Sequence, residues 1–288
     1  MKARVLHAVK GRLSLRPPQA ESLARLVRAL DAAPEMLDHQ RDVAAILSTL
    51  QAEFPTLEDF ERDFPSLCFA LATGVGKTRL MGAFIAYLHL AHGLRNFFVL
   101  APNLTIYTKL VADFTPNTPK YVFKGLSEFA IDAPRVITGE NYDQQNIAAG
   151  TLFGEVRINI FNIAKINSEV RGGKEPRIKR MREVLGDSYF NHLANLPDLV
   201  LLMDESHRYR AQAGMRAINE LQPLFGLELT ATPFVESSRG PVPFKNRVMD
   251  YPLARALEDG FVKEPAVVTQ RHFDAKAHTP EEIETIKL

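Results

Sequence analysis

Residues 67–84 read LCFALATGVGKTRLMGAF, and this stretch decides the fold. It opens with the apolar run Leu67–Leu71, which has the length of a buried β-strand. A glycine-containing turn follows, and helix-forming residues then run over Thr78–His89. Strand, glycine loop and helix in this order predict a phosphate-binding loop, because glycines let backbone N–H groups curl around phosphate oxygens at the positive end of a helix.

The loop supplies the side chains that a nucleotide needs. Lys77 is expected to neutralise the β- and γ-phosphates, and the Thr78 hydroxyl to ligate Mg²⁺. The general pattern of such loops opens with glycine, where this sequence has Leu71. The expected nucleotide-binding residues of the loop are Thr73, Gly74, Val75, Gly76, Lys77, Thr78 and Arg79.

Further apolar runs of strand length alternate with helix-like segments along the chain. The other expected strands are Phe97–Ala101, Arg135–Thr138, Val156–Phe161, Leu199–Met203 and Leu227–Thr230. Besides Thr78–His89, a helix is expected over Ala211–Leu221. Upstream, the region from Pro18 to Gln51 is helix-rich and includes the amphipathic segment Glu21–Leu30. This alternation predicts an α/β fold: a mainly parallel sheet with helices on both faces, preceded by an N-terminal helical segment.

A second polar group stands at the end of another apolar strand, where residues 199–207 read LVLLMDESH. Open α/β sheets place their ligands at the carboxyl ends of strands. Asp204 is suited to hold Mg²⁺, and Glu205 to orient and deprotonate the water that attacks the γ-phosphate. A zinc or serine-nucleophile site is disfavoured here, because the spaced His/Cys partners and the nucleophile elbow of such sites are missing from this stretch.

Composition excludes some protein classes. The chain has 35 basic and 34 acidic residues, which argues against a polyanion-coating protein and leaves any contact with nucleic acid to local patches. Its one cysteine, Cys68, cannot form an internal disulfide and is expected to be a small core residue. With neither a signal-peptide pattern nor about 18 consecutive apolar residues, a cytoplasmic location without a membrane partner is expected.

Three segments together resemble a known family. ATGVGKT at residues 72–78, LLMDESH at 201–207 and LTATP at 229–233 resemble motifs I, II and III of superfamily 2 helicases. The set is most similar to the helicase (Res) subunit of type III restriction enzymes and related DEAD/DEAH-box defence proteins. The resemblance implies a RecA-like, ATP- and Mg²⁺-dependent lobe of a DNA helicase or translocase. It implies catalytic roles for Lys77, Asp204 and Glu205, and Leu71 is similar to what such helicases carry at that position.

The resemblance extends to less specific segments. Gln19 in LRPPQ resembles the glutamine that reads the adenine edge, with Gln40 as a competing candidate. His207, Thr230 and Thr232 are implied to couple the ATP site to nucleic acid. Contacts with the nucleic-acid backbone are implied for Pro102, Asn103, Thr138, Gly139 and Asn162. For Asn103, Thr138 and Asn162, capping or turn formation is an equally good reading. The basic stretch Arg171–Arg182 binds phosphate or is a solvated charged face.

The expected organisation has three parts: residues 1–60 as a helical lead-in, 61–262 as the first RecA-like lobe, and 263–288 as a linker or the start of a second lobe. After Pro233 roughly 55 residues remain, too few for a second lobe, so weak ATP hydrolysis by this chain alone is expected. Duplex DNA, and a methyltransferase or another defence-system subunit, are the expected partners. The alternatives are a nucleotide-dependent nucleic-acid-binding module without productive turnover, and an RNA helicase.

Overall fold

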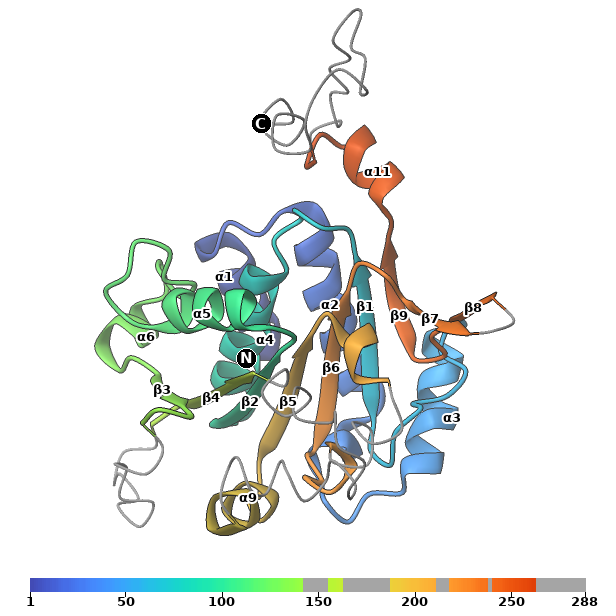
Figure 1. The fold of residues 1–288 in the computed structure, drawn as a ribbon, viewed down its shortest axis with the longest axis horizontal. Helices are drawn as coiled ribbons and strands as arrows, with labels where there is room; N and C mark the ends of the chain where they lie inside the picture. Colours follow the sequence, from blue (N-terminus) through green and yellow to red (C-terminus); the bar gives the residue numbers. More distant parts are fainter. Residues whose placement is uncertain (142–154, 163–186, 211–217, 238–239, 263–288) are drawn as a thin grey trace, which may run out of the picture.

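The computed structural model describes residues 1–141, 155–162, 187–210, 218–237 and 240–262. Within these residues, seven strands form one parallel sheet in the order β3-β4-β2-β5-β6-β1-β9 (Figure 1). The strands are β1 (Ser66–Leu71), β2 (Asn96–Ala101), β3 (Arg135–Thr138), β4 (Arg157–Asn162), β5 (Leu199–Asp204), β6 (Phe225–Thr230) and β9 (Arg247–Tyr251).

Helices surround the sheet, and a two-stranded antiparallel hairpin projects from it (Figure 1). The α-helices are α1 (Lys2–Arg12), α2 (Pro17–Ala32), α3 (Val43–Glu53), α4 (Lys77–His92), α5 (Leu104–Phe114), α6 (Ser127–Ile131), α9 (Asp187–Ala194) and α11 (Leu253–Glu258). The 3₁₀ helices are η1 (Pro34–Leu37) and η2 (Ser206–Tyr209), and the hairpin pairs β7 (Phe234–Ser237) with β8 (Gly240–Pro243).

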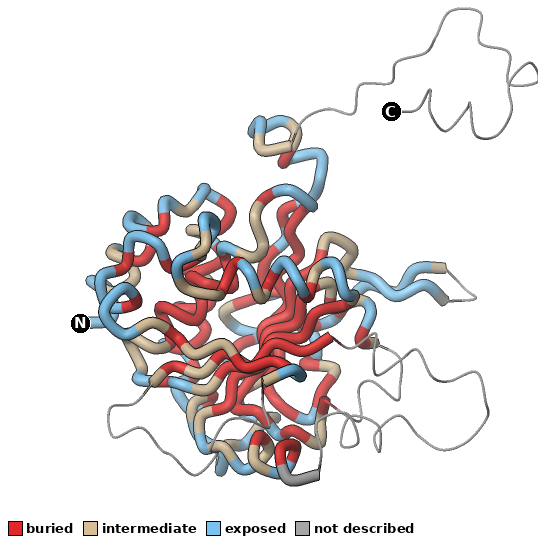
Figure 2. Tube along the Cα trace, turned by 60° about the vertical axis from the view of Figure 1, so that its left-hand side comes forward, coloured by how far each residue is buried: buried red, intermediate tan, exposed pale blue. Residues whose placement is uncertain are grey.

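The central strands contribute side chains to two hydrophobic cores, one on each face of the sheet. In β2, Phe97 and Val99 join the larger cluster, which contains residues of α2 and α4. The alternate residues Phe98 and Leu100 join a smaller cluster with Phe190 of α9. Successive side chains of a strand point to opposite faces, so a strand covered on both sides is apolar throughout. The buried strands run through the middle of the molecule in Figure 2.

The N-terminal helices pack on this sheet. Leu23, Leu26 and Leu30 of α2 are buried in the same cluster as Phe69 of β1. Arg25 fastens α2 to the edge strand β9, donating from Nη1 to the Val248 carbonyl at 2.6 Å. The expected N-terminal helical segment is confirmed, and it contributes one wall of the main core.

The predicted fold class is confirmed. All six expected strands are present with ends shifted by at most two residues, and α4 occupies the expected helix after the loop. Strand β9 was not expected. Residues 211–217 of the expected Ala211–Leu221 helix, and the basic stretch 171–182, lie outside the described residues. Cys68 is fully buried, as predicted. Within the described ranges, no helix is both long and apolar enough to cross a bilayer.

Candidate active site

The glycine loop turns sharply between β1 and α4 because two of its glycines adopt left-handed backbone angles. Gly74 has a φ of 88° and Gly76 a φ of 95°, a region that side-chain-bearing residues rarely adopt. A Cβ atom on Gly76 would also lie 2.5 Å from Nε2 of Gln19. Gly76 is the N-cap of α4, so Lys77 and Thr78 begin that helix at its positive end.

Gln19 lies directly behind this loop, buried at 2% exposure. Its Nε2 donates to the carbonyls of Val75 at 3.0 Å and Gly76 at 2.9 Å, and its Oε1 accepts from the Arg16 N–H at 2.8 Å. The amide therefore holds the loop to the start of α2. Gln40, the competing candidate, is exposed and lies in the turn after η1. The structure brings Gln19, and not Gln40, to the loop; adenine reading by Gln19 remains a prediction.

The lysine and the carboxylate pair meet in front of the loop. Lys77 Nζ lies 2.9 Å from Glu205 Oε1, although the strands that precede these residues, β1 and β5, are separated in the sheet by β6. Glu205 itself has a φ of 48°, a left-handed angle that turns the chain sharply after β5. Burial, helped by the neighbouring charge of Glu205, raises the pKa of Asp204 to about 6, and Lys77 opposes this rise.

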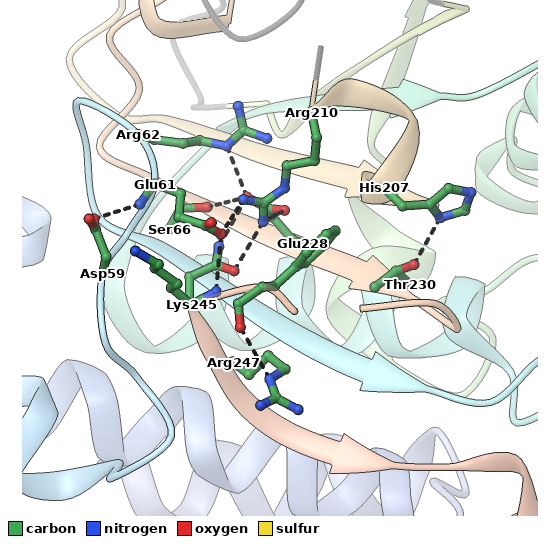
Figure 3. Close-up of polar contacts among 12 residues, drawn as sticks. Asp59, Glu61, Arg62, Ser66, His207, Arg210, Glu228, Thr230, Lys245 and Arg247 are labelled. Carbon is green, nitrogen blue, oxygen red and sulfur yellow. Dashed lines mark hydrogen bonds and ion pairs between the residues drawn. The ribbon is translucent and has the colours of Figure 1, made fainter. Parts of the chain in front are cut away.

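His207 lies between Glu205 and the carboxyl end of β6. Its Nδ1 lies 3.0 Å from the Thr230 hydroxyl oxygen and 2.9 Å from that of Thr232 (Figure 3 draws the Thr230 contact). Its Nδ1 also lies 3.6 Å from Glu205 Oε2. Burial lowers the pKa of His207, which favours the neutral ring. The three expected coupling residues therefore form one hydrogen-bonded group at the carboxyl end of β6.

A pocket of about 820 Å³ lies at the phosphate loop, and its lining includes Lys77, Thr78, Asp204 and Glu205. This volume lies within the range of roughly 300–1,000 Å³ typical of small-molecule sites. Thr78 and Asp204 offer oxygen donors, and Mg²⁺ in phosphoryl-transfer sites takes one or two protein oxygens beside phosphate oxygens. The donor set therefore fits a Mg²⁺–nucleotide complex.

Comparison with known proteins identifies the family of this chain. A family model described as "Type III restriction enzyme, res subunit" matches residues 12–235, most of the chain. The chain belongs to this family. A search of curated proteins gave no significant match.

Solved structures of similar fold include the SWI2/SNF2 ATPase core of Sulfolobus solfataricus in complex with double-stranded DNA (15% identity, TM-score 0.36, covering 76% of this chain and 32% of that one). A second is a nuclease-deletion mutant of the type ISP restriction-modification enzyme LlaGI in complex with a DNA substrate mimic (14% identity, TM-score 0.43, covering 77% of this chain and 20% of that one). A third is the type ISP enzyme LlaBIII bound to DNA (15% identity, TM-score 0.45, covering 76% of this chain and 16% of that one). The Res-family chain thus spans about a third or less of their lengths. It carries a RecA-like helicase ATPase lobe.

The residues expected to contact nucleic acid lie on the other half of the same sheet edge. Pro102 and Asn103 follow β2, Thr138 ends β3 and Gly139 follows it, and Asn162 ends β4. These strands are neighbours in the order β3-β4-β2, whereas the nucleotide residues follow β5, β6 and β1.

Two of these side chains are already engaged in local structure. Asn103 Oδ1 caps α5 by accepting from the Ile106 N–H at 2.9 Å. The Thr138 hydroxyl accepts from the Glu140 N–H at 3.3 Å, and the backbone N–H of Thr138 donates to Asn141 Oδ1. Asn103 therefore caps a helix and Thr138 stabilises a turn, and contact of either residue with nucleic acid stays a prediction.

In this Res-family lobe, sequence reasoning missed a buried charge cluster that lies to the left of His207 and Thr230 in Figure 3. Glu228 in the middle of β6 is fully buried. It accepts from Arg62 Nε at 2.9 Å and from Arg210 Nη2 at 2.6 Å. Glu61 also pairs with Arg210. Burial alone would raise the pKa of Glu228, but the two arginines lower it to about 2.

Arg210 connects this cluster to the active site, because it follows η2 and lies six positions after Asp204. Its guanidinium also stacks 3.8 Å from the ring centroid of Phe244, just beyond β8. The one sequence signal was a charged residue inside the apolar strand FGLELT.

Proposed function

We propose that this chain is the ATP-binding and ATP-hydrolysing lobe of a DNA helicase or translocase of a type III restriction-like or phage-defence system. The observation that carries the proposal is the convergence of Lys77, the carboxylate pair and the His207 group at adjoining strand ends. The lysine and the carboxylate pair are parts that phosphoryl-transfer catalysis requires.

In this proposal each residue has a distinct role. Lys77 binds the β- and γ-phosphates, and Thr78 and Asp204 hold Mg²⁺, which neutralises charge that develops on the phosphates. Glu205 orients and deprotonates the attacking water. His207, Thr230 and Thr232 report the state of this site to the nucleic-acid half of the sheet edge. Residues 61–262 form the lobe, with 1–60 as its helical lead-in.

DNA is the proposed partner because the family is named for a subunit of restriction enzymes, which act on DNA. Asn103, Thr138 and Asn162 lie at the carboxyl ends of neighbouring strands, so a nucleic-acid backbone lying across that edge would pass all three positions. A methyltransferase subunit is a further proposed partner. Competition binding with duplex DNA, single-stranded DNA and RNA tests the choice, and preference for RNA would replace the DNA helicase with an RNA helicase.

We also propose that residues 1–288 alone hydrolyse ATP slowly. An arginine from a second lobe ordinarily stabilises the transition-state charge, and it contributes about 10³–10⁵ in rate. The described residues form one lobe. A steady-state ATPase assay with and without duplex DNA checks this, and robust DNA-stimulated turnover would contradict it.

The decisive experiment compares Glu205→Gln with Lys77→Ala. Glu205→Gln should bind an ATP analogue in the presence of Mg²⁺ but lose hydrolysis, because the amide cannot take a proton from water. Lys77→Ala should lose binding as well. Unchanged function of the protein with Glu205→Gln would instead support a nucleic-acid-binding module without productive turnover.

A further inference from the structure

Helix α5 places a lysine against the phosphate loop. Lys109 Nζ donates to the Thr78 hydroxyl oxygen at 3.3 Å. Asp113, one turn further along α5, lies 3.8 Å from the same ammonium group and is itself only 6% exposed. A buried carboxylate therefore holds the ammonium beside the hydroxyl that is proposed to ligate Mg²⁺.

Lys109 lines the same pocket as Lys77, Asp204 and Glu205. It reaches the pocket from a helix outside the three sequence motifs. Burial is the main cause of the raised pKa of Asp204, and the positive charge of Lys109 opposes that rise. The triphosphate of a nucleotide bound in this pocket would therefore meet two lysines, Lys77 beside Glu205 and Lys109 beside Thr78. Charge-assisted hydrogen bonds of this kind are roughly twice as strong as neutral ones.

We propose that Lys109 is a second phosphate-binding residue that substitutes for Mg²⁺ when the metal is missing. The inference rests on the proposed nucleotide function. The ammonium and the metal ion would use the same hydroxyl oxygen of Thr78, so they compete for one position. The contribution of Lys109 to nucleotide affinity is therefore largest without Mg²⁺ and smallest with it.

The test is titration of residues 1–288 with ribose-labelled fluorescent ATP, once with Mg²⁺ and once with EDTA. Lys109→Met should weaken binding about tenfold in EDTA, the change expected for loss of one charge-assisted hydrogen bond. With Mg²⁺ the loss should stay below about threefold. Lys109→Arg should restore most of the metal-free affinity. The Lys109 side chain is 58% exposed, so its replacement is not expected to unfold the protein, and a thermal melt checks this.

Lys124→Met is the matched control. Lys124 lines the same pocket, and among the described residues no hydrogen bond or ion pair joins it to the loop. If both methionine variants lose affinity equally, only the net charge of the pocket matters and the inference is wrong. An equal loss for Lys109→Met with and without Mg²⁺ also overturns it. If the unmodified chain fails to bind labelled ATP even with Mg²⁺, the proposed function fails first, and this inference falls with it.

Discussion

Replacing Glu228 by Gln removes a buried negative charge that pairs with both Arg62 and Arg210. The glutamine keeps the size of the side chain, but it leaves two guanidinium groups with much less compensation. Breaking a buried ion pair by removing one partner costs roughly 3–5 kcal/mol. The pKa gives a second route to the magnitude: a fall from 4.5 to about 2 corresponds to about 3 kcal/mol. Both routes give a loss of about 3 kcal/mol or more.

Urea unfolding at pH 7 measures this change in the free energy of unfolding. The matched control is Glu53→Gln, because Glu53 lies 2.6 Å from Arg28 with both side chains more than a third exposed. Exposed pairs contribute about 0–1 kcal/mol, so this variant should unfold close to the unmodified protein. The identical chemical change at a similar distance then isolates the effect of burial.

Acidification gives an independent check with a defined sign. The pKa of Glu228 is lower in the folded chain, so its contribution is fully present above the unfolded value of about 4.5 and is lost as pH falls towards about 2. The difference between the unmodified protein and Glu228→Gln should be constant from pH 7 to about 5.5 and shrink below about 4.5. A cost of Glu228→Gln no larger than that of Glu53→Gln, or a difference that stays undiminished below about pH 4 while the protein is still folded, would refute this reasoning.

Three further changes probe the loop and its connections. Gly76→Ala should lose nucleotide binding and lower the melting temperature more than Gly93→Ala. Both glycines have a positive φ, but a Cβ at Gly76 would lie against Gln19, whereas a Cβ at Gly93 meets open space. Equal effects of the two substitutions would show that the close approach of Gly76 to Gln19 does not matter. Gln19→Leu should cost about 1–3 kcal/mol in urea unfolding, since the Val75 and Gly76 carbonyls lose their donor, whereas Gln40→Leu should be neutral. A reduced preference of Gln19→Leu for ATP over GTP would show that the amide also reads adenine. In a protein that joins this lobe to a second one, His207→Ala should abolish the response of the ATPase rate to duplex DNA while leaving the basal rate within about fivefold. An unaltered response there would remove His207 from the coupling group.

The sheet could be predicted from local patterns, because Leu67–Leu71 and Leu199–Met203 are uniform apolar runs that end in loops with recognisable chemistry. Strand β9 escaped prediction because RVMDY is short, begins with a charge and carries an exposed Asp250 at the sheet edge. It is a strand because β1 provides a parallel partner, which is a tertiary cause.

The site was predictable where one short segment carries the chemistry and unpredictable where distant segments meet. Lys77 and the carboxylate pair belong to such segments. The partners of Glu228 lie 166 and 18 positions away, in Arg62 and Arg210. Lys109 likewise meets Thr78 only because α5 packs beside α4. No local pattern encodes either meeting.

The bridge between Lys77 and Glu205 has a consequence for how affinity and turnover are linked. Under the proposed function, an incoming triphosphate exchanges one anionic partner of Lys77 for another, so the measured affinity is the difference between two contacts and not the strength of one. The same exchange releases Glu205, which becomes available to water only once phosphate has taken its place. Glu205→Gln should therefore do more than stop hydrolysis: it should also tighten binding, since the resident competitor is gone. In the proposed mechanism, the residue that acts as base is therefore also the group that the substrate displaces from Lys77.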